Sequence, residues 1–173
     1  MTARPEKLWL ETSTDLRRID AHPDYWYPVA WSREVKPGKA YAARFAGEPI
    51  VLVRPKVQSN DGALFALEDR CAHRQVPLSK GTVDGCTLRC GYHGWRYDAS
   101  GACVDVPYLG KGKLPNGVRR YPCFERDGLI FVWPGASPAA APLARIGAAA
   151  DTAYRRGDSA STSPATTVSC TRT

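Results

Sequence analysis

Two cysteines and two histidines stand in two short pairs, and their spacing constrains the fold of this 173-residue chain more than any other feature. Cys71 and His73 are separated by one residue, Cys90 and His93 by two, and sixteen residues lie between the pairs. Deprotonated cysteine and histidine bind metals, and two such pairs on separate loops can close on one site. Four ligands of this kind suit zinc or an iron–sulfur cluster. The chain is therefore expected to fold around two loops that meet at a metal centre.

The order of the ligands favours one of these metals. In a Rieske centre two thiolates hold one iron of a [2Fe–2S] cluster and two imidazoles hold the other, so each loop supplies one Cys and one His, as it does here. Zinc sites more often take two cysteines from one hairpin and two histidines from one helix turn. The Cys-x-His spacing is too short for one helical face, and Gly91 and Gly94 indicate a bent loop backbone. A [2Fe–2S] cluster is favoured, with a zinc site and a chance arrangement as the alternatives.

The residues around both pairs are similar to those of a known family. CAHRQVPLSKG, followed by CGYHGWRYD, resembles the cluster-binding loops of Rieske non-haem iron (ring-hydroxylating) oxygenases, in the N-terminal Rieske domain of their large (α) subunits. The resemblance runs from about Trp26 to about Pro134. It implies a small antiparallel β domain of the Rieske type, whose two loops bind one [2Fe–2S] cluster through Cys71, His73, Cys90 and His93.

The same resemblance implies an oxidoreductase component that transfers one electron at a time. The donor would be an NAD(P)H-linked reductase or a ferredoxin. The acceptor would be a non-haem iron in an oxygenase catalytic domain, which activates O₂ to hydroxylate an aromatic or related apolar substrate. The family also implies a trimer of α subunits, an assembly that is not expected without the catalytic domain.

The catalytic iron of the family has no predicted site in these residues. Oxygenases of this family bind that iron through two histidines and one carboxylate, whereas this sequence has three histidines, of which only His22 lies outside the two pairs. We therefore expect neither a mononuclear Fe(II) nor a catalytic residue in the sequence. It is interpreted as a fragment, a truncated gene product or a free-standing Rieske ferredoxin. A zinc-stabilised binding module without redox activity is the alternative from a different functional class.

Three positions predict a low reduction potential. High-potential Rieske proteins join the two loops by a disulfide and place a serine after the second His-Gly, and the corresponding positions here hold Val76, Tyr92 and Trp95. Fewer hydrogen bonds to the cluster sulfurs leave the oxidised state better stabilised, so the potential is expected near the bottom of the Rieske range of about −150 to +300 mV. Trp95 and Tyr97 are expected to shield the cluster from water or to pack in the core.

The rest of the composition narrows the cellular setting. No apolar run is long enough to cross a bilayer, and the N-terminus lacks the features of a signal peptide. In a reducing cytoplasm, the expected location, the four other cysteines are free thiols without a ligand role: Cys86, Cys103, Cys123 and Cys170. The net charge of +7 is spread among acidic residues, which argues against a nucleic-acid partner.

Short β-prone segments between turn residues predict a mostly β fold with one domain over residues 25–135. Residues 1–24 are expected to form an N-terminal extension with a short helix over Thr14–Asp20. Residues 136–173 are rich in Ala, Ser, Thr, Pro and Arg, which predicts a disordered low-complexity tail or the truncated start of a catalytic domain. Strands are predicted over 25–31, 41–45, 50–54, 63–67, 86–89, 95–97, 102–106, 118–125 and 129–133. Turns are predicted at 58–62 and 81–85, and a hairpin across Gly47-Glu48 is predicted to join 41–45 to 50–54.

Overall fold

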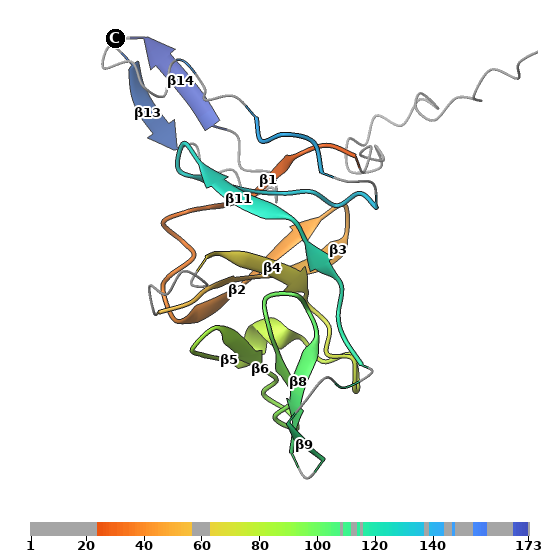
Figure 1. The fold of residues 1–173 in the computed structure, drawn as a ribbon. Helices are drawn as coiled ribbons and strands as arrows, with labels where there is room; N and C mark the ends of the chain where they lie inside the picture. Colours follow the sequence, from red (N-terminus) through yellow and green to blue (C-terminus); the bar gives the residue numbers. More distant parts are fainter. Residues whose placement is uncertain are drawn as a thin grey trace, which may run out of the picture.

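The computed structural model describes residues 24–56, 63–107, 109–111, 114, 116–136, 139–143, 147, 154–158 and 168–172. Nearly all regular structure in this part of the chain is antiparallel β, which confirms the predicted fold class (Figure 1). The described strands form small sheets, and the segments that carry the two Cys-His pairs gather near β5, β6 and β8, below the layer that contains β2, β3 and β4.

The sheets are assembled from neighbouring hairpins. A four-stranded sheet has the order β10-β4-β3-β2, with β2 at Lys39–Phe45, β3 at Glu48–Arg54, β4 at Phe65–Glu68 and β10 at Arg120–Tyr121. A three-stranded sheet has the order β1-β12-β11, with β1 at Tyr27–Trp31, β11 at Cys123–Arg126 and β12 at Leu129–Val132. A five-stranded sheet runs β5-β6-β7-β8-β9, with strands at Thr82–Asp84, Thr87–Arg89, Arg96–Tyr97, Cys103–Val106 and Gly110–Lys111. A single 3₁₀ turn, η2, spans Leu78–Lys80 and precedes β5.

Strands β3 and β4 separate two apolar cores, because successive side chains of a strand point to opposite faces. Val51, Val53 and Leu67 belong to the core that also contains the cysteines of both pairs. Ile50 and Leu52 belong to a second core, shared with β1 and β12. The four central residues of β3, from Ile50 to Val53, are completely buried, and each such side chain contributes about 1.5–3 kcal/mol relative to leaving it exposed. The Cys-His loops are therefore anchored on the best-packed layer of the fold.

The hairpin β2–β3 turns at Ala46 and Gly47, one residue earlier than predicted. Both residues have positive φ, 47° and 86°, as the two-residue turns that match strand twist require. Glu48 was expected in the turn but instead begins β3 and pairs with Phe45. The Gly47-Glu48 dipeptide indicated where the hairpin lies, whereas its exact register depends on how the two strands pair.

Two other predicted boundaries differ from the structure. The single strand predicted over 118–125 is divided at Pro122 into β10, which pairs with β4, and β11, which pairs with β12. Proline has no N–H for a ladder and so marks the crossing between sheets. Of the residues 81–85, for which a turn was predicted, Thr82–Asp84 instead form strand β5 and pair with β6, so the turn begins only at Gly85.

The C-terminal segment 136–173, predicted as a disordered low-complexity tail or the truncated start of a catalytic domain, contains a pair of described strands. Tyr154–Asp158 (β13) and Val168–Arg172 (β14) form an antiparallel ladder; backbone pairing of this kind requires no apolar periodicity, so composition did not indicate it. The indole N–H of Trp26 donates to the Ala140 carbonyl oxygen at 3.0 Å. The helix predicted over Thr14–Asp20 and the turn over Gln58–Gly62 lie outside the described residues. Within the described residues, no helix is long and apolar enough to cross a membrane.

Candidate metal centre

The first Cys-His loop is a tight reversal that begins where β4 ends. The N–H of Cys71 donates to the Val76 carbonyl oxygen at 2.9 Å, and the N–H of Gln75 donates back to the Cys71 carbonyl oxygen at 2.8 Å. Gln75 has φ 58°, a left-handed conformation that is uncommon outside glycine. The loop therefore turns around Cys71 and leaves His73 at its exposed tip.

The second loop repeats the same hydrogen-bond pattern around Cys90. Its N–H donates to the Trp95 carbonyl oxygen at 2.8 Å, and the Gly94 N–H donates to the Cys90 carbonyl oxygen at 3.2 Å. Gly94 has φ 76°, so both loops place a left-handed residue four positions after the cysteine. Gly94 also has little room for a side chain, since an added Cβ would lie 3.1 Å from Cγ of Pro107. Two equivalent loops thus present one cysteine and one histidine each.

The thiols and the imidazoles are segregated by burial. Cys71 and Cys90 are 1% and 3% exposed and share one core, whereas His73 and His93 are exposed. The imidazole rings lie next to each other, with centroids 4.7 Å apart and planes at 62°. Within the described residues, no three or more His, Cys, Asp or Glu side chains converge where one metal ion could be held. The predicted ligands are therefore brought together as an inner pair of thiols and an outer pair of imidazoles.

The protonation tendencies of the ligands follow from this arrangement. Burial raises the pKa of the Cys90 thiol, as does the neighbouring Cys71 thiol, while backbone N–H groups of Tyr92 and His93 lower it. The Cys90 thiol thus holds its proton until a cation compensates the charge of its thiolate. The pKa of His73 is lowered by lost hydration, with the nearby His93 and Arg74 acting in the same direction. A lowered pKa favours neutral imidazole, which is the form that binds metal.

Three aromatic residues surround the ligands. The Trp95 ring stacks on His73, with centroids 4.9 Å apart and planes 2° apart, so one face of that imidazole is covered. Tyr92, 58% exposed, lies against His93 at 3.7 Å between centroids. The Tyr97 hydroxyl lies 3.2 Å from the Cys71 sulfur and accepts a hydrogen bond from the Ala72 N–H at 3.1 Å. Sequence reasoning expected Tyr97 only as a shield or a core residue; its contact with sulfur depends on β7 bringing it beneath the first loop.

The remaining candidates from the sequence lie apart from this arrangement or beyond the described residues. In the part of the chain that the structure describes, Cys86, Cys103 and Cys123 form no disulfide bond. Burial raises the pKa of Cys103, and it raises that of Cys123 to about 11, which is typical of structural rather than reactive thiols. Cys170 lies in β14, of which only the backbone is described, and His22 lies outside the described residues.

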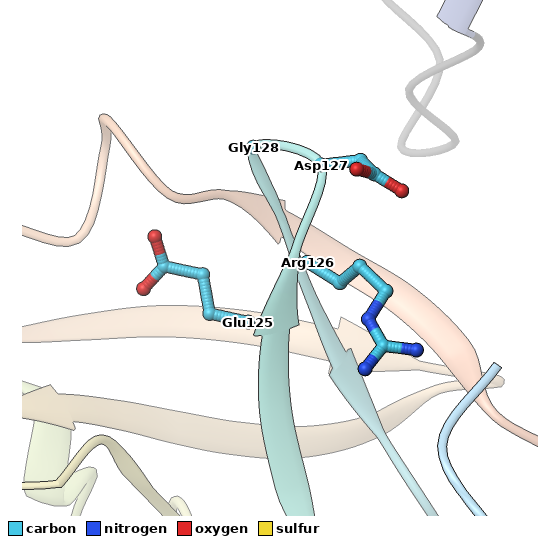
Figure 2. Close-up of a pocket in the computed structure, with 4 residues that line it drawn as sticks. All are labelled: Glu125, Arg126, Asp127 and Gly128. Atoms are coloured by element: carbon cyan, nitrogen blue, oxygen red, sulfur yellow. The ribbon is translucent and has the colours of Figure 1, made fainter. Parts of the chain in front are cut away.

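A hollow elsewhere on the surface has no comparable chemistry. It has a volume of about 410 Å³ and is lined by Glu125, Arg126, Asp127 and Gly128, at the turn between β11 and β12. Figure 2 shows the side chains of Glu125 and Arg126 on opposite sides of β11, with Asp127 at the turn. Among the described residues, no cysteine or histidine lines this hollow, and the layer of β2–β4 separates β11 from the Cys-His loops in Figure 1. The candidate site is therefore the pair of loops.

Comparisons with known proteins point to the same loops. The model of the Rieske [2Fe-2S] domain family matches residues 25–130. A 4beta-methylsterol monooxygenase of Methylococcus capsulatus is 42% identical over 124 residues, which is 69% of this chain and 32% of that protein. A putative toluene-4-sulfonate monooxygenase iron-sulfur subunit of Comamonas testosteroni is 44% identical over 112 residues, 64% of this chain and 30% of its own length.

Solved structures give the same result. The crystal structure of dicamba monooxygenase bound to dicamba superposes with a TM-score of 0.68 at 34% identity, covering 79% of this chain and 40% of that one. A structure of NdmA from Pseudomonas putida with caffeine has a TM-score of 0.65 at 34% identity, over 79% of this chain and 40% of the other. The chain spans about a third of the length of the curated relatives named above.

Proposed function

This chain belongs to the Rieske [2Fe-2S] domain family, and from that premise we propose that it transfers single electrons through a [2Fe–2S] cluster held by its two Cys-His loops. The observation that carries the proposal is the separation of the candidate ligands into a buried thiol pair and an exposed imidazole pair. A single zinc ion would need all four groups around one point, whereas two irons need two pairs. The ligands we assign are Cys71, His73, Cys90 and His93.

The surroundings of the two pairs fit such a cluster. When bound, the cluster would supply a one-electron redox couple. The apolar core excludes water from the sulfur side, and the backbone N–H groups of Tyr92 and His93 face the Cys90 sulfur. Tyr97 adds a hydroxyl at the Cys71 sulfur. The exposed imidazoles form the side of the domain that a partner can approach, and we place electron exit there.

We further propose that the chain acts as the Rieske domain of an oxygenase. Its relatives named above are a monooxygenase and an iron-sulfur subunit of a monooxygenase system. An NAD(P)H-linked reductase or ferredoxin would supply the electrons, and a non-haem iron in an oxygenase catalytic domain would receive them. With one histidine outside the two pairs, these 173 residues offer no two-His-one-carboxylate site, so we propose that the catalytic iron is not held by them.

The charge around the imidazoles suggests the chemistry of the partner surface. Arg74, next to His73 in sequence, is exposed, and so is Arg89, whose guanidinium lies against Gly94 at the base of the second loop. Exposed guanidinium groups steer acidic surfaces toward the site and improve association rates more than final affinity. We therefore propose an acidic docking surface on the redox partner.

The decisive experiment is metal and sulfide analysis of the chain purified after expression with iron supplied. We expect two irons and two acid-labile sulfides per chain, a red-brown colour, and an EPR signal on reduction. Cys71→Ser and Cys90→Ser should each abolish all three, because a ligand is lost and the loops depend on the metal. Cys86→Ser is the matched control and should keep them.

The outcome separates the two classes of function. Stoichiometric zinc with no sulfide would reject the Rieske proposal in favour of a zinc-stabilised binding module. A cluster that survives loss of Cys71 or Cys90 would show that the ligand assignment is wrong. A chain with a cluster that supports turnover only when a separate oxygenase catalytic domain is added would distinguish the oxygenase component from a free-standing ferredoxin.

A further inference from the structure

Asp69 is the one buried charged or polar side chain in the described part of the chain, 6% exposed. It follows β4 directly and stands two residues before Cys71. Its N–H donates to the Pro49 carbonyl oxygen at 3.0 Å, which fixes its backbone to the start of β3. A carboxylate is costly to bury without partners, so the groups that face it are significant.

Both carboxylate oxygens of Asp69 accept hydrogen bonds from one residue, Ser79. The Ser79 N–H donates to Oδ1 at 2.6 Å, and its hydroxyl donates to Oδ2 at 2.6 Å. Ser79 lies in the 3₁₀ turn η2, whose first N–H groups have no partner within the turn. The carboxylate therefore closes the first Cys-His loop by joining a point just before Cys71 to a point after it.

The same turn is the contact between the two loops. An added Cβ on Gly81 would lie 2.1 Å from the Arg89 carbonyl oxygen, directly before Cys90. An added Cβ on Gly91 would lie 3.1 Å from the Lys80 carbonyl oxygen. The backbones of the two loops thus touch at η2, and Leu78 is completely buried there. Whatever fixes η2 also fixes the distance between the two cysteines.

We propose that Asp69 is a positioning residue for the cluster, which holds Ser79 and η2 so that the two Cys-His loops keep the spacing that a [2Fe–2S] cluster requires. The hydrogen bonds of the Asp69 carboxylate join it to Ser79, and it acts on the loops through that residue. The inference rests on the proposed function, since it concerns how that cluster is held. The interaction belongs to the chain itself and can be tested without an oxygenase partner.

The experiment compares variants of the whole 173-residue chain with the cluster loaded. Cluster loss is followed as bleaching of visible absorbance in the presence of an iron chelator, and ligand geometry as the EPR spectrum of the reduced protein. Asp69→Asn and Ser79→Ala should lose the cluster about tenfold faster than the unmodified chain, as expected when an outer partner of a metal site is removed. Their EPR signals should also be broader. Ser79→Thr keeps the N–H and the hydroxyl and should restore both properties.

Asp98 provides a matched control. It accepts hydrogen bonds from the N–H and the hydroxyl of Ser100, at 2.8 and 2.5 Å, in the turn between β7 and β8. Asp98→Asn makes the same substitution in another carboxylate–serine pair and should lower thermal stability while leaving the EPR spectrum and the rate of cluster loss unchanged. A variant that only destabilises the fold is thereby separated from one that displaces the ligands.

Each result decides the inference. Cluster loss and EPR spectra of Asp69→Asn and Ser79→Ala that match Asp98→Asn would overturn it. If Asp69→Asn does not fold, the Ser79→Ala and Ser79→Thr pair decides, and equal cluster loss in both would also overturn it. If the unmodified chain itself assembles no [2Fe–2S] cluster, the proposed function fails first and the positioning role fails with it.

Discussion

Replacing Tyr97 by Phe should lower the reduction potential of the cluster. The Tyr97 hydroxyl oxygen already accepts the Ala72 N–H at 3.1 Å, so its own hydrogen is free for the Cys71 sulfur 3.2 Å away. When Cys71 is a thiolate ligand it has no proton to give, and the hydroxyl must be the donor. Burial and the neighbouring Cys71 raise the pKa of Tyr97, so the phenol keeps its proton at neutral pH.

The size of the effect follows from the change in charge on the sulfur. Reduction adds negative charge to the cluster and strengthens any hydrogen bond donated to its sulfurs. A net hydrogen bond contributes about 0.5–1.5 kcal/mol, and more when the acceptor is charged. If about 1–1.4 kcal/mol of this is gained only in the reduced state, the potential falls by about 40–60 mV when the hydroxyl is removed, since 59 mV corresponds to a factor of ten for one electron.

The assay is a redox titration of the cluster followed by EPR or circular dichroism, with Tyr121→Phe as the control. Tyr121 is also buried, but it belongs to the second core and is separated from the thiols by β3 and β4. Its replacement should leave the potential within about 10 mV of the unmodified chain. A potential for Tyr97→Phe that is unchanged, or raised, would refute the argument that this hydroxyl donates to the ligand sulfur.

Three further predictions concern stability and pH. In Gly81→Ala the added Cβ would lie 2.1 Å from the Arg89 carbonyl oxygen, so the free energy of unfolding in urea should drop by about 1–3 kcal/mol. Gly147→Ala, where an added Cβ meets nothing within 4 Å and φ is not positive, should lose less. Burial raises the pKa of the Cys123 thiol from 9.0 to about 11, so this thiol ionises at a lower pH in the unfolded chain than in the folded one. The free energy of unfolding should therefore fall by about 1–2 kcal/mol between pH 9 and 11, and Cys123→Ala should abolish this loss. Because His73 and His93 are exposed, their ring N–H groups should lose protons more readily when the cluster is oxidised, and the potential should decrease as pH rises; a constant potential across the neutral and alkaline range would contradict this.

The two Cys-His pairs could be recognised in the sequence as candidate ligands because metal chemistry is local. The residue types that bind iron or zinc are few, and the interval between them limits which loop can carry them. The strands could be predicted because β3 and β4 show dense β-prone apolar residues between turn signals. The observed strand boundaries differ from the predicted ones where pairing with another sheet determines them. At Pro122, for example, the chain leaves one sheet and enters another.

The interactions that tune and hold the site were not predictable in the same way. The pair formed by Asp69 and Ser79 spans ten residues, and that formed by Cys71 and Tyr97 spans 26. The sequence around Ser79 or Tyr97 does not show whether its side chain hydrogen-bonds to a distant residue, faces solvent or packs in the core. Such contacts arise only once the two loops have been folded back onto the central sheet, so they depend on topology rather than on propensity.

This difference bears on the low potential expected from the sequence. That expectation counted a missing serine and a missing disulfide, at positions that hold Trp95, Val76 and Tyr92. The structure adds a donor that the count omitted, since Tyr97 reaches the Cys71 sulfur from β7. Trp95, in the serine position, stacks on the His73 imidazole and so covers one face of that ring. Hydrogen bonds to sulfur and the covering of a ligand face are separate means of setting a potential. Here Tyr97 adds the first at Cys71, and Trp95 provides the second at His73. The potential should therefore lie above that of a Rieske centre lacking both the serine and the tyrosine, and below that of one that has both.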